Sequence, residues 1–425
     1  MAFRGNIVEL VENESVNGVT QISASWSRIP LKSVAKVING FAFKSKQFNT
    51  SKGTPLVRIR DVLRGYTDTF YEGEIPDGYW VERDDILVGM DGDFNTCRWP
   101  SNKALLNQRV CKIEVFDSGV YDSRFLFYLL PTYLRLINEN TSATTVKHLS
   151  SKTLAELPIP NPSIDEQKRI ADKLDSVLAK VEAAQTRLDK IPAILKRFRQ
   201  SVLAAAASGE LTKEWREERQ LPYDYEQYRF DEILVELRNG LSAKPNEDGK
   251  GTPILRISSV RAMEIDQADI RYLEIADKEI EKYKLKTGDL LFTRYNGSLE
   301  FVGVCGVLED LQHDNLVYPD KLIRARLNEK ALPKFIEILF SSPYIRDQVT
   351  GCVKTTSGQK GISGKDLKEQ LIMLPSVSEQ NEIVISVTKL LARARRVEKN
   401  YTKARIKLDS LTQSILSKAF SGKLS

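Results

Sequence analysis

The sequence predicts an α+β protein in which two α/β globular units alternate with two long helices that form an antiparallel coiled coil, related by a pseudo-twofold internal repeat. A repeated block is the first observation behind this prediction. KTLAELPIPNPSIDEQ starts at Lys152 and KDLKEQLIMLPSVSEQ starts at Lys365, an offset of 213 residues with eight of sixteen positions identical. The same offset returns where SVLAAAASGEL from Ser201 matches SILSKAFSGKL from Ser414. The chain is therefore a duplicated unit, although duplication for stability alone would leave the same pattern.

Shorter matches lie upstream of both blocks. They pair Asn39-Gly40 with Asn239-Gly240, GTPLVRI from Gly53 with GTPILRI from Gly251, and Asp85-Ile86-Leu87 with Asp289-Leu290-Leu291. Because these offsets are 200, 198 and 204, each copy has a globular part with loops of variable length before the part of fixed length. Along the chain we expect an N-terminal arm (1–27), a first globular unit (28–161), a first coiled-coil helix (162–209), a linker (210–226), a second globular unit (227–374), and a second coiled-coil helix with the tail (375–425).

Alternating strands and turns are the second observation, and they predict that both globular units are α/β. The expected strands are PLVRIRDV, DDILVGM and RVCKIEV in the first unit, and PILRISSV, GDLLFTRY and KLIRARL in the second. FLFYLLPTYL and PKFIEILFSSPYI predict helices that are interrupted or ended at proline.

Matching start and stop signals bound the two long helices. The predicted capping boxes are Ser163 with Glu166 and Ser376 with Glu379, and the predicted glycine caps are Gly209 and Gly422. Between them, apolar residues recur in steps of four and three from Ile170 to Ala205 and from Ile383 to Ile415. This stripe is typical of a coiled coil, and an amphipathic helix on a globular core is the alternative. Pro192 predicts a kink or short break near Leu188 to Pro192, whereas its counterpart Arg405 predicts none.

The first stripe would be on the order of 50 Å long at about 1.5 Å per residue. Antiparallel pairing would place the two globular units at opposite ends of such a rod. A rod of this length exceeds one turn of duplex DNA, which is about 34 Å. The helices would then act as a ruler between the two globular units.

Composition limits the class of protein. The net charge of +6 and the pI near 8.9 permit a nucleic-acid partner without requiring one. Cys97, Cys111, Cys305 and Cys352 form no CxxC pair, so neither a zinc knuckle nor a disulfide framework is indicated. The start has no apolar signal-peptide core, and no stretch of about 18 apolar residues exists. We expect a cytoplasmic protein that does not contact a membrane.

Polar and basic residues in corresponding loops of the two units are candidates for DNA binding. Arginine matches guanine and Asn or Gln matches adenine in the major groove, while lysine suits phosphates. The candidates are Lys44, Lys46, Arg58, Arg60, Asn95, Arg98, Gln108, Arg109 and Lys147 in the first unit, and Lys244, Arg256, Arg294, Tyr295, Asn296, Lys321, Gln359 and Lys360 in the second. A single surface cation is usually a solvated charge, and Arg58 and Arg256, which match within strands, have a structural alternative.

Motifs for catalysis are absent from the sequence. The chain has neither a glycine-rich cofactor loop with an [Asn/Asp]-Pro-Pro-aromatic motif nor a phosphate loop, because Gly364-Lys365 is followed by Asp366. Only His148 and His313 exist, which argues against a histidine-based metal or acid–base site. A nuclease site would need Asp320 to act with Asp366 and Lys368, but the first copy has Thr153 and Ala155 at the last two positions.

The duplicated pattern resembles the specificity subunit of type I restriction–modification systems. The resemblance rests on Pro162 with Glu166-Gln167, on Pro375 with Glu379-Gln380, on the S-G-x-L ends of both helices, and on the blocks GTPLVRI, GTPILRI and TRYNGS. It implies that the globular units are target recognition domains, that each reads one half of a split site in double-stranded DNA, and that the helices set the spacing.

The resemblance also implies the partners and cofactors. Two modification subunits that bind S-adenosylmethionine and methylate adenine would dock on the helical parts, and restriction subunits that use ATP and Mg would complete the nuclease. This chain itself would carry no cofactor, no metal and no catalytic residue. The first unit has Gly89-Met90-Asp91-Gly92 where the second has Thr293-Arg294-Tyr295-Asn296-Gly297, so the two halves should recognise different bases. The alternatives are a coiled-coil scaffold without a DNA role and a self-contained DNA-modifying enzyme.

Overall fold

The computed structural model describes residues 3, 5–14, 20–141, 146–246, 248–356 and 359–423. The chain forms two compact units: unit 1 contains residues 1–188 and 403–425, and unit 2 contains residues 189–402. Each unit mixes helices and sheets, so the α+β class is confirmed. Over the described ranges, no helix is both long and apolar enough to cross a membrane.

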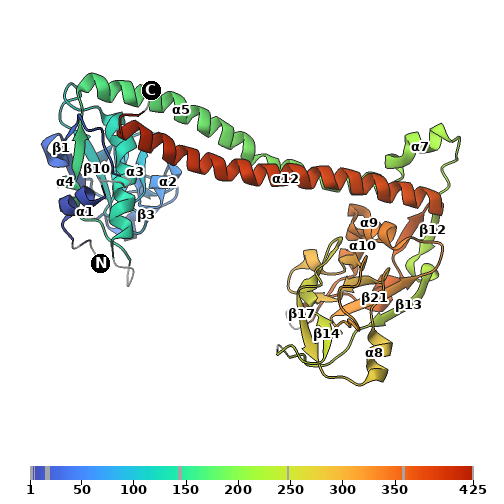
Figure 1. The fold of residues 1–425 in the computed structure, drawn as a ribbon. Coiled ribbons are helices and arrows are strands. Elements are labelled where there is room, and N and C mark those ends of the chain that lie inside the picture. Colours follow the sequence, from blue (N-terminus) through green and yellow to red (C-terminus); the bar gives the residue numbers. More distant parts are fainter. Residues whose placement is uncertain are drawn as a thin grey trace. The chain divides into compact units, whose positions relative to one another are not determined.

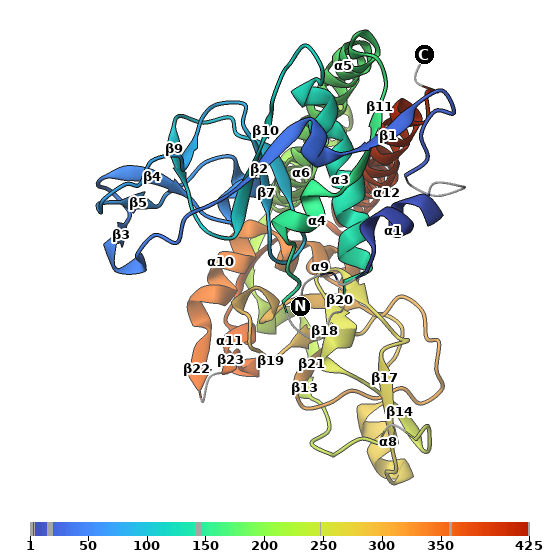
Figure 2. The same cartoon turned by 90° about the vertical axis from the view of Figure 1, so that its left-hand side faces the viewer.

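A four-stranded antiparallel sheet is the centre of unit 1. Its order is β2 (Ala35–Asn39), β10 (Val110–Val115), β7 (Ile86–Gly89), β8 (Thr96–Arg98). Helix α3 (Ser123–Glu139) lies beside β10 (Figure 1), and its Phe125 and Leu129 share a core with Ile113 of that strand. Figure 2 shows a second group of strands in a lobe beside β2, β10 and β7. That lobe contains β3 (Phe48–Asn49), β5 (Phe70–Tyr71), β4 (Thr54–Val57), β9 (Ala104–Leu106) and β6 (Trp80–Val81).

Unit 2 repeats this sheet with the same strand order. The strands are β13 (Leu234–Asn239), β21 (Leu322–Leu327), β18 (Leu290–Thr293) and β20 (Cys305–Val307). Helices α9 (Pro333–Ser341) and α10 (Pro343–Cys352) pack on it through Phe335 and Ile345. The smaller sheets pair β14 (Thr252–Leu255) with β17 (Ile270–Leu273), β15 (Val260–Arg261) with β16 (Glu264–Ile265), and β19 (Tyr295–Asn296) with β23 (Gln359–Gly361) and β22 (Lys354–Thr356).

Two-stranded ribbons connect each globular part to its long helix. They pair β1 (Ser27–Pro30) with β11 (Pro158–Asn161) in unit 1, and β12 (Glu226–Arg229) with β24 (Leu371–Leu374) in unit 2. Short helices complete the fold: α1 (Ile7–Asn13), α2 (Asp61–Arg64), α4 (Ser151–Ala155), α7 (Lys213–Glu218), α8 (Asp277–Tyr283) and α11 (Gly364–Lys368).

Four of the six predicted strands are present as β7, β10, β18 and β21, although β18 covers only Leu290–Thr293, half of GDLLFTRY. The other two are shorter than predicted. PLVRIRDV is a strand only to Val57, because Asp61 Oδ2 accepts the N–H of Arg58 (2.9 Å) and starts α2. PILRISSV ends as a strand at Leu255, where Ser259 Oγ accepts the N–H of Arg256 (2.8 Å).

The proline prediction for the globular helices was right in one unit and wrong in the other. Helix α9 ends at Ser341, before Pro343, as predicted. Helix α3, by contrast, continues through Pro131. Pro131 lies on the exposed side of α3, and buried Leu130 and Leu134 on either side hold the helix against the core, which offsets the lost backbone bond.

A close backbone approach explains the duplicated Asn-Gly pairs. A Cβ built on Gly40 would lie 2.0 Å from the carbonyl oxygen of Asn107, and one on Gly240 would lie 2.2 Å from that of Pro319. Both glycines donate to the neighbouring strand, Gly40 to Val110 O (3.0 Å) and Gly240 to Leu322 O (3.1 Å). The repeated glycine is therefore required by packing in each unit.

We expect Gly240→Ala to lower the free energy of unfolding by about 1–3 kcal/mol, because the added methyl group must displace backbone. The control is Gly351→Ala in α10, where a Cβ meets nothing within 4 Å. That change should raise stability by up to about 1 kcal/mol through the lower entropy of the unfolded chain. Thermal unfolding of the full chain measures both, and equal shifts would contradict the steric explanation.

In unit 1, α5 (Ile164–Asp189) runs antiparallel to the last part of α12 (Val377–Phe420). Near the start of α5, Ile170 and Leu174 share a core with Ile415 and Ala419 of α12. Further along α5, Gln185 lies beside Arg405, which is earlier in α12. The two contacts run in opposite directions along the chain, so the two helix segments are antiparallel.

In unit 2, α6 (Ile191–Ala207) runs antiparallel to the first part of α12. Arg199 pairs with Glu398 at 2.6 Å, while Ala206, one helix turn or more later, shares a core with Ile383 and Val387. The break predicted near Pro192 is confirmed, because α5 ends at Asp189 and α6 begins at Ile191. Arg405, the counterpart of Pro192, lies within the unbroken helix α12, as predicted.

The caps of the long helices follow the prediction in part. Ser163 Oγ and Ser376 Oγ each accept the N–H of the glutamate three residues later, at 3.4 Å. Gly209 and Gly422 adopt the left-handed backbone, with φ of +76° and +73°. The glutamate side chains were predicted to return to the serine backbone, but Glu166 bonds Arg169 and Glu379 bonds a buried cluster instead.

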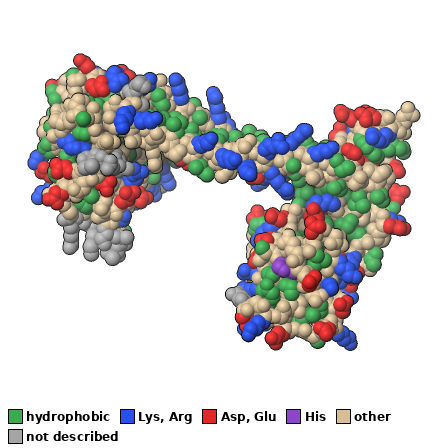
Figure 3. Space-filling model, in the orientation of Figure 1, with side chains coloured by type: hydrophobic (Ala, Val, Ile, Leu, Met, Phe, Trp, Pro, Cys, Tyr) green, Lys and Arg blue, Asp and Glu red, His purple; other side chains and the backbone are tan. Residues whose placement is uncertain are grey.

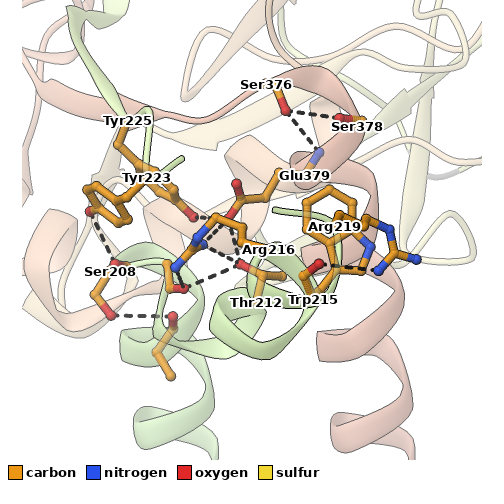
Figure 4. A network of polar contacts seen from close by, with 12 residues as sticks. Ser208, Thr212, Trp215, Arg216, Arg219, Tyr223, Tyr225, Ser376, Ser378 and Glu379 are labelled. Atoms are coloured by element: carbon orange, nitrogen blue, oxygen red, sulfur yellow. Dashed lines mark hydrogen bonds and ion pairs between the residues drawn. The ribbon is translucent and has the colours of Figure 1, made fainter. Parts of the chain in front are cut away.

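That buried cluster folds residues 208–225 onto the start of α12 (Figure 4). Glu379 Oε1 accepts bonds from Arg216, from Thr212 Oγ1 (2.6 Å) and from Tyr225 OH (3.0 Å). The guanidinium of Arg216 also donates to the carbonyl of Gly209 (2.8 Å). The side chains of Arg216 and Glu379 are only 8% and 3% exposed, so the segment expected as a linker is an ordered part of unit 2.

A buried glutamine ties the start of each long helix to the globular part of its unit. Gln167 Oε1 accepts the N–H of Asp122 (2.8 Å), the residue that caps α3. Gln380 Oε1 accepts the N–H of Leu332 (2.9 Å), which precedes α9 in the same way. Each Nε2 donates to the carbonyl of the preceding proline (2.9 and 3.0 Å). The repeated Glu-Gln pair thus has one constant structural role, which the glutamine performs.

Candidate nucleic-acid interface

Three segments of unit 1 meet where β7 ends. The N–H of Met90 donates to the carbonyl of Arg109 (2.9 Å), and the carbonyl of Met90 accepts from Leu149 (2.7 Å). The residue after Met90, Asp91, bridges to His148 across the same end of the sheet. We call this the strand-end surface of unit 1, defined by residues 90–92, 108–109 and 147–149.

The same backbone connections recur in unit 2. The N–H of Arg294 donates to Lys321 O (2.8 Å), and the carbonyl of Arg294 accepts from Ile362 (2.9 Å). The strand-end surface of unit 2 therefore consists of residues 294–296, 320–321 and 359–362. The equivalent positions are Met90 and Arg294, Asp91 and Tyr295, Arg109 and Lys321, and Leu149 and Ile362.

Charged side chains of unit 1 are organised around one carboxylate. Asp91 Oδ2 accepts from Arg109 Nη1 (2.5 Å), and Asp91 Oδ1 lies 2.8 Å from His148 Nδ1. Gln108, next to Arg109, is exposed. Lys147 is half-buried and donates to the carbonyl and side-chain oxygens of Asn138 (2.6 and 2.9 Å). These bonds tie this part of the surface to α3.

Unit 2 presents different chemistry on the same backbone. The guanidinium of Arg294 lies 4.7 Å from the centre of the Tyr295 ring, a cation–π distance. Its Nε is buried and has no hydrogen-bond partner among the described residues. Strands β19 and β23 carry Asn296 and Lys360 in register. Lys321 and Gln359 are exposed beside them.

The remaining candidates from the sequence are not among the residues of these surfaces, although Asn95 lies next to one of them through its bond to Gly89. Several are held by neighbouring groups: Arg60 by Asp68 (2.5 Å), Arg98 by Asp84 (2.9 Å), and Arg256 by Asp269 (3.1 Å). Lys44 and Lys244 are exposed in loops, and Lys46 is exposed in the short 3-10 helix Ser45–Gln47. Arg58 lies 5.9 Å from the Phe48 ring, and Asn95 uses its carbonyl to bond Gly89 (2.8 Å).

The structure thus places nine of the seventeen candidates on the two strand-end surfaces. They are Gln108, Arg109 and Lys147 in unit 1, and Arg294, Tyr295, Asn296, Lys321, Gln359 and Lys360 in unit 2. Sequence reasoning missed Asp91 and His148 as members of the first surface. The constant offset of 213 between Lys147 and Lys360 was a usable signal, because it aligns His148 with a position inside the candidate loop.

Lysine and arginine side chains also follow the long helices (Figure 3). In the unit 2 part of α12 the exposed cations are Lys389, Arg393, Arg395, Arg396 and Lys399. Such a basic stripe attracts a polyanion without selecting its sequence.

The cysteines in the globular part of unit 1 are not nucleophiles. Burial raises the pKa of the Cys97 thiol to about 12, and burial raises that of Cys111 to about 12 as well. A thiol with such a pKa is protonated at neutral pH, so it supplies no thiolate for catalysis. Over the described ranges, no three His, Cys, Asp or Glu side chains are grouped as metal ligands.

Comparison with known proteins shows the family. Residues 24–193 match the model of the type I restriction modification DNA specificity domain. The chain is 44% identical to the type I restriction enzyme EcoKI specificity subunit of Escherichia coli K12, over 95% of this chain and 90% of the relative. It is 42% identical to the EcoBI specificity subunit of Escherichia coli, over 100% and 91% of the two chains.

Solved structures share the fold. A chain from a type I R-M system, in a study of its complex assembly and conformational transition, aligns with a TM-score of 0.64 and 17% identity, covering 95% of this chain and 100% of that one. The HsdS subunit from Thermoanaerobacter tengcongensis aligns with a TM-score of 0.57 and 18% identity, covering 95% and 98%. With relatives this similar over nearly its whole length, the chain belongs to the specificity subunits of type I restriction–modification enzymes.

Proposed function

We propose that this chain recognises a bipartite, split site in double-stranded DNA and directs adenine methylation and restriction by partner subunits. One observation carries the proposal: the two units present strand-end surfaces with the same backbone connections but different side chains. A constant backbone with varied polar groups is what reading two different short sequences requires, because base edges are distinguished by side-chain donors and acceptors.

The long helices supply the spacing in this proposal. The helix segments are antiparallel within each unit, and α12 belongs to both units. We infer that α5, α6 and α12 together form one antiparallel coiled coil that holds two target recognition domains a set distance apart. The basic stripe of α12 would add sequence-independent attraction to the DNA backbone.

Catalysis belongs to the partners in this proposal. Two modification subunits bind S-adenosylmethionine and methylate adenine, and restriction subunits use ATP and Mg. The chain has no glycine-rich cofactor loop and no [Asn/Asp]-Pro-Pro-aromatic motif in its sequence, which supports a non-catalytic role. The relatives from Escherichia coli are specificity subunits of restriction enzymes, which fits a chain that leaves catalysis to its partners.

The test is to co-express the chain with its modification subunits in a host free of other methyltransferases, and to sequence modified bases across the genome. We expect methylated adenines in one motif with two specific parts separated by unspecified bases. Arg294→Ala with Lys321→Ala should change the preferred bases in one part only, because both residues belong to unit 2. A continuous motif, or changes in both parts, would contradict the two-reader proposal.

The purified chain alone separates the alternatives. We expect no methyl transfer from S-adenosylmethionine and no cleavage of duplex DNA by the isolated chain, and activity when the modification subunits are added. Methylation by the isolated chain would favour a self-contained enzyme. If the modification subunits bind duplex DNA no better with this chain than without it, a scaffold without a DNA role is favoured.

A further inference from the structure

One partly covered carboxylate in unit 1 holds an exposed arginine in place. The Asp91 side chain is 12% exposed, whereas that of Arg109 is 64% exposed. Both carboxylate oxygens are engaged, Oδ2 with Arg109 and Oδ1 with His148. The guanidinium is therefore anchored through Nη1 and still faces solvent. No second carboxylate pairs with Arg109 in the part of the chain that the structure describes.

The backbone of Arg109 is constrained as well. Its φ is +71°, in the left-handed region that L residues other than Asn and Asp rarely adopt. The carbonyl of Arg109 accepts from Met90 (2.9 Å), and the N–H of the preceding Gln108 donates to Phe41 O (2.8 Å). Contacts on both sides hold this strained turn, and such strain is concentrated at functional sites.

The equivalent positions of unit 2 lack this arrangement. Lys321 stands in place of Arg109, and Tyr295 stands in place of Asp91. A lysine offers a single ammonium, whereas a guanidinium offers a planar pair of donors in a fixed fork. The carboxylate-anchored arginine is thus specific to unit 1, as a residue that selects bases should be when the two units read different sequences.

We propose that Arg109 reads a guanine in the half-site of unit 1, with Asp91 as the residue that positions its guanidinium; this rests on the proposed function. Guanine is the base that fits, because its O6 and N7 accept the two parallel N–H bonds of an arginine in the major groove. Anchoring through Nη1 lowers the entropy lost when the remaining N–H groups bind. His148 shares the carboxylate and limits the positions that Asp91 can take.

The test uses the complex of the full chain with its modification subunits and a set of duplexes, each with one base of the motif replaced. Arg109→Gly is the main variant, because glycine adopts the left-handed backbone without strain. We expect the preference for one guanine in one half of the motif to fall by roughly 10- to 100-fold. Preferences in the other half should not change.

Two further variants make the test specific. Arg109→Lys keeps the charge and loses the fork, so discrimination should fall while the salt dependence of DNA binding stays the same. Asp91→Asn should give a smaller loss at the same guanine and at no other base. As the matched control, Arg98→Ala removes an arginine paired with Asp84, opposite Ile86 at the other end of β7, and should leave the motif unchanged.

The outcomes are separable. If Arg109→Gly lowers methylation equally on all duplexes, Arg109 contacts phosphate and the proposal is overturned. If it leaves every base preference intact, or if Arg98→Ala produces the same change, the proposal is also overturned. If the unmodified complex shows no split motif at all, the proposed function itself fails, and this is seen before any variant is made.

Discussion

Glu379→Ala is expected to lower the free energy of unfolding of unit 2 by about 3–5 kcal/mol, the cost of leaving one partner of a buried ion pair alone. Glu379 Oε1 is the shared acceptor of Arg216, Thr212 and Tyr225. Without it, the buried guanidinium of Arg216 retains the carbonyl of Gly209 and Thr212 Oγ1, but no negative charge. Thermal unfolding and hydrogen exchange of residues 208–225 measure the effect.

The duplication supplies an internal control. Glu166 is the repeat counterpart of Glu379, but its side chain is 30% exposed and pairs with Arg169 one helix turn away (2.8 Å). Glu166→Ala should therefore cost only about 0–1 kcal/mol. The arginine beside Glu166 holds the pKa of that carboxyl below its usual value, so this small contribution is present at neutral pH and is lost on acidification through the folded-state pKa.

A double variant tests the cause of the large effect. Arg216→Met with Glu379→Leu removes both charges and fills the same space with apolar atoms, so most of the stability lost in Glu379→Ala should return. Stacked Tyr223 and Tyr225, whose ring centres are 4.5 Å apart, would remain to cover the site. Equal losses for Glu379→Ala and Glu166→Ala would show that the buried cluster does not stabilise unit 2.

Gln380→Leu is expected to cost about 3 kcal/mol, because it removes three hydrogen bonds and leaves partly buried backbone groups without these partners. The side chain bonds Leu332 N, Lys330 O and Pro375 O at 2.8–3.0 Å. The amide of Leu332 should exchange with solvent faster in the variant, which hydrogen exchange measures directly. That amide precedes α9, so the loss would loosen the globular part of unit 2 from the start of α12.

The repeat allows the same substitution to be tested at the corresponding glutamine of unit 1. Gln167→Leu should have a similar cost in unit 1 and should speed exchange at Asp122 rather than at Leu332. Gln200→Leu on the exposed face of α6 is the control, and it should change stability by less than about 0.5 kcal/mol. If either buried glutamine behaves like Gln200, these bonds do not hold the long helices to the globular parts.

Local signals made the helices and much of the fold predictable. The serine caps, the left-handed glycines and the break at Pro192 depend on neighbouring residues in the chain, and all three are confirmed. Strand alternation located the central strands of both units for the same reason. The duplication strengthened each prediction, because a short pattern that could occur once by chance occurs at corresponding positions of both copies.

The candidate site was predictable only as a set of residue types. Arg98 is the last residue of β8 and Arg109 directly precedes β10, yet Arg109 lies on the strand-end surface and Arg98 at the far end of β7. Pairing across the sheet determines this, and no local pattern encodes it. The anchoring role of Asp91 was missed because its partners Arg109 and His148 are 18 and 57 residues away.

By itself, the sequence determined the duplication, the long helices with their ends and break, and the family, because these depend on local propensity and on residues repeated at a constant offset. Only the tertiary structure decided which contacts each of two repeated residues makes and how deeply each is buried. Glu379 meets Arg216, 163 residues away, in a buried cluster, while Glu166 is partly exposed and pairs with Arg169, three residues away. Burial and long-range pairing depend on which segments fold together, and they give identical residues different energies.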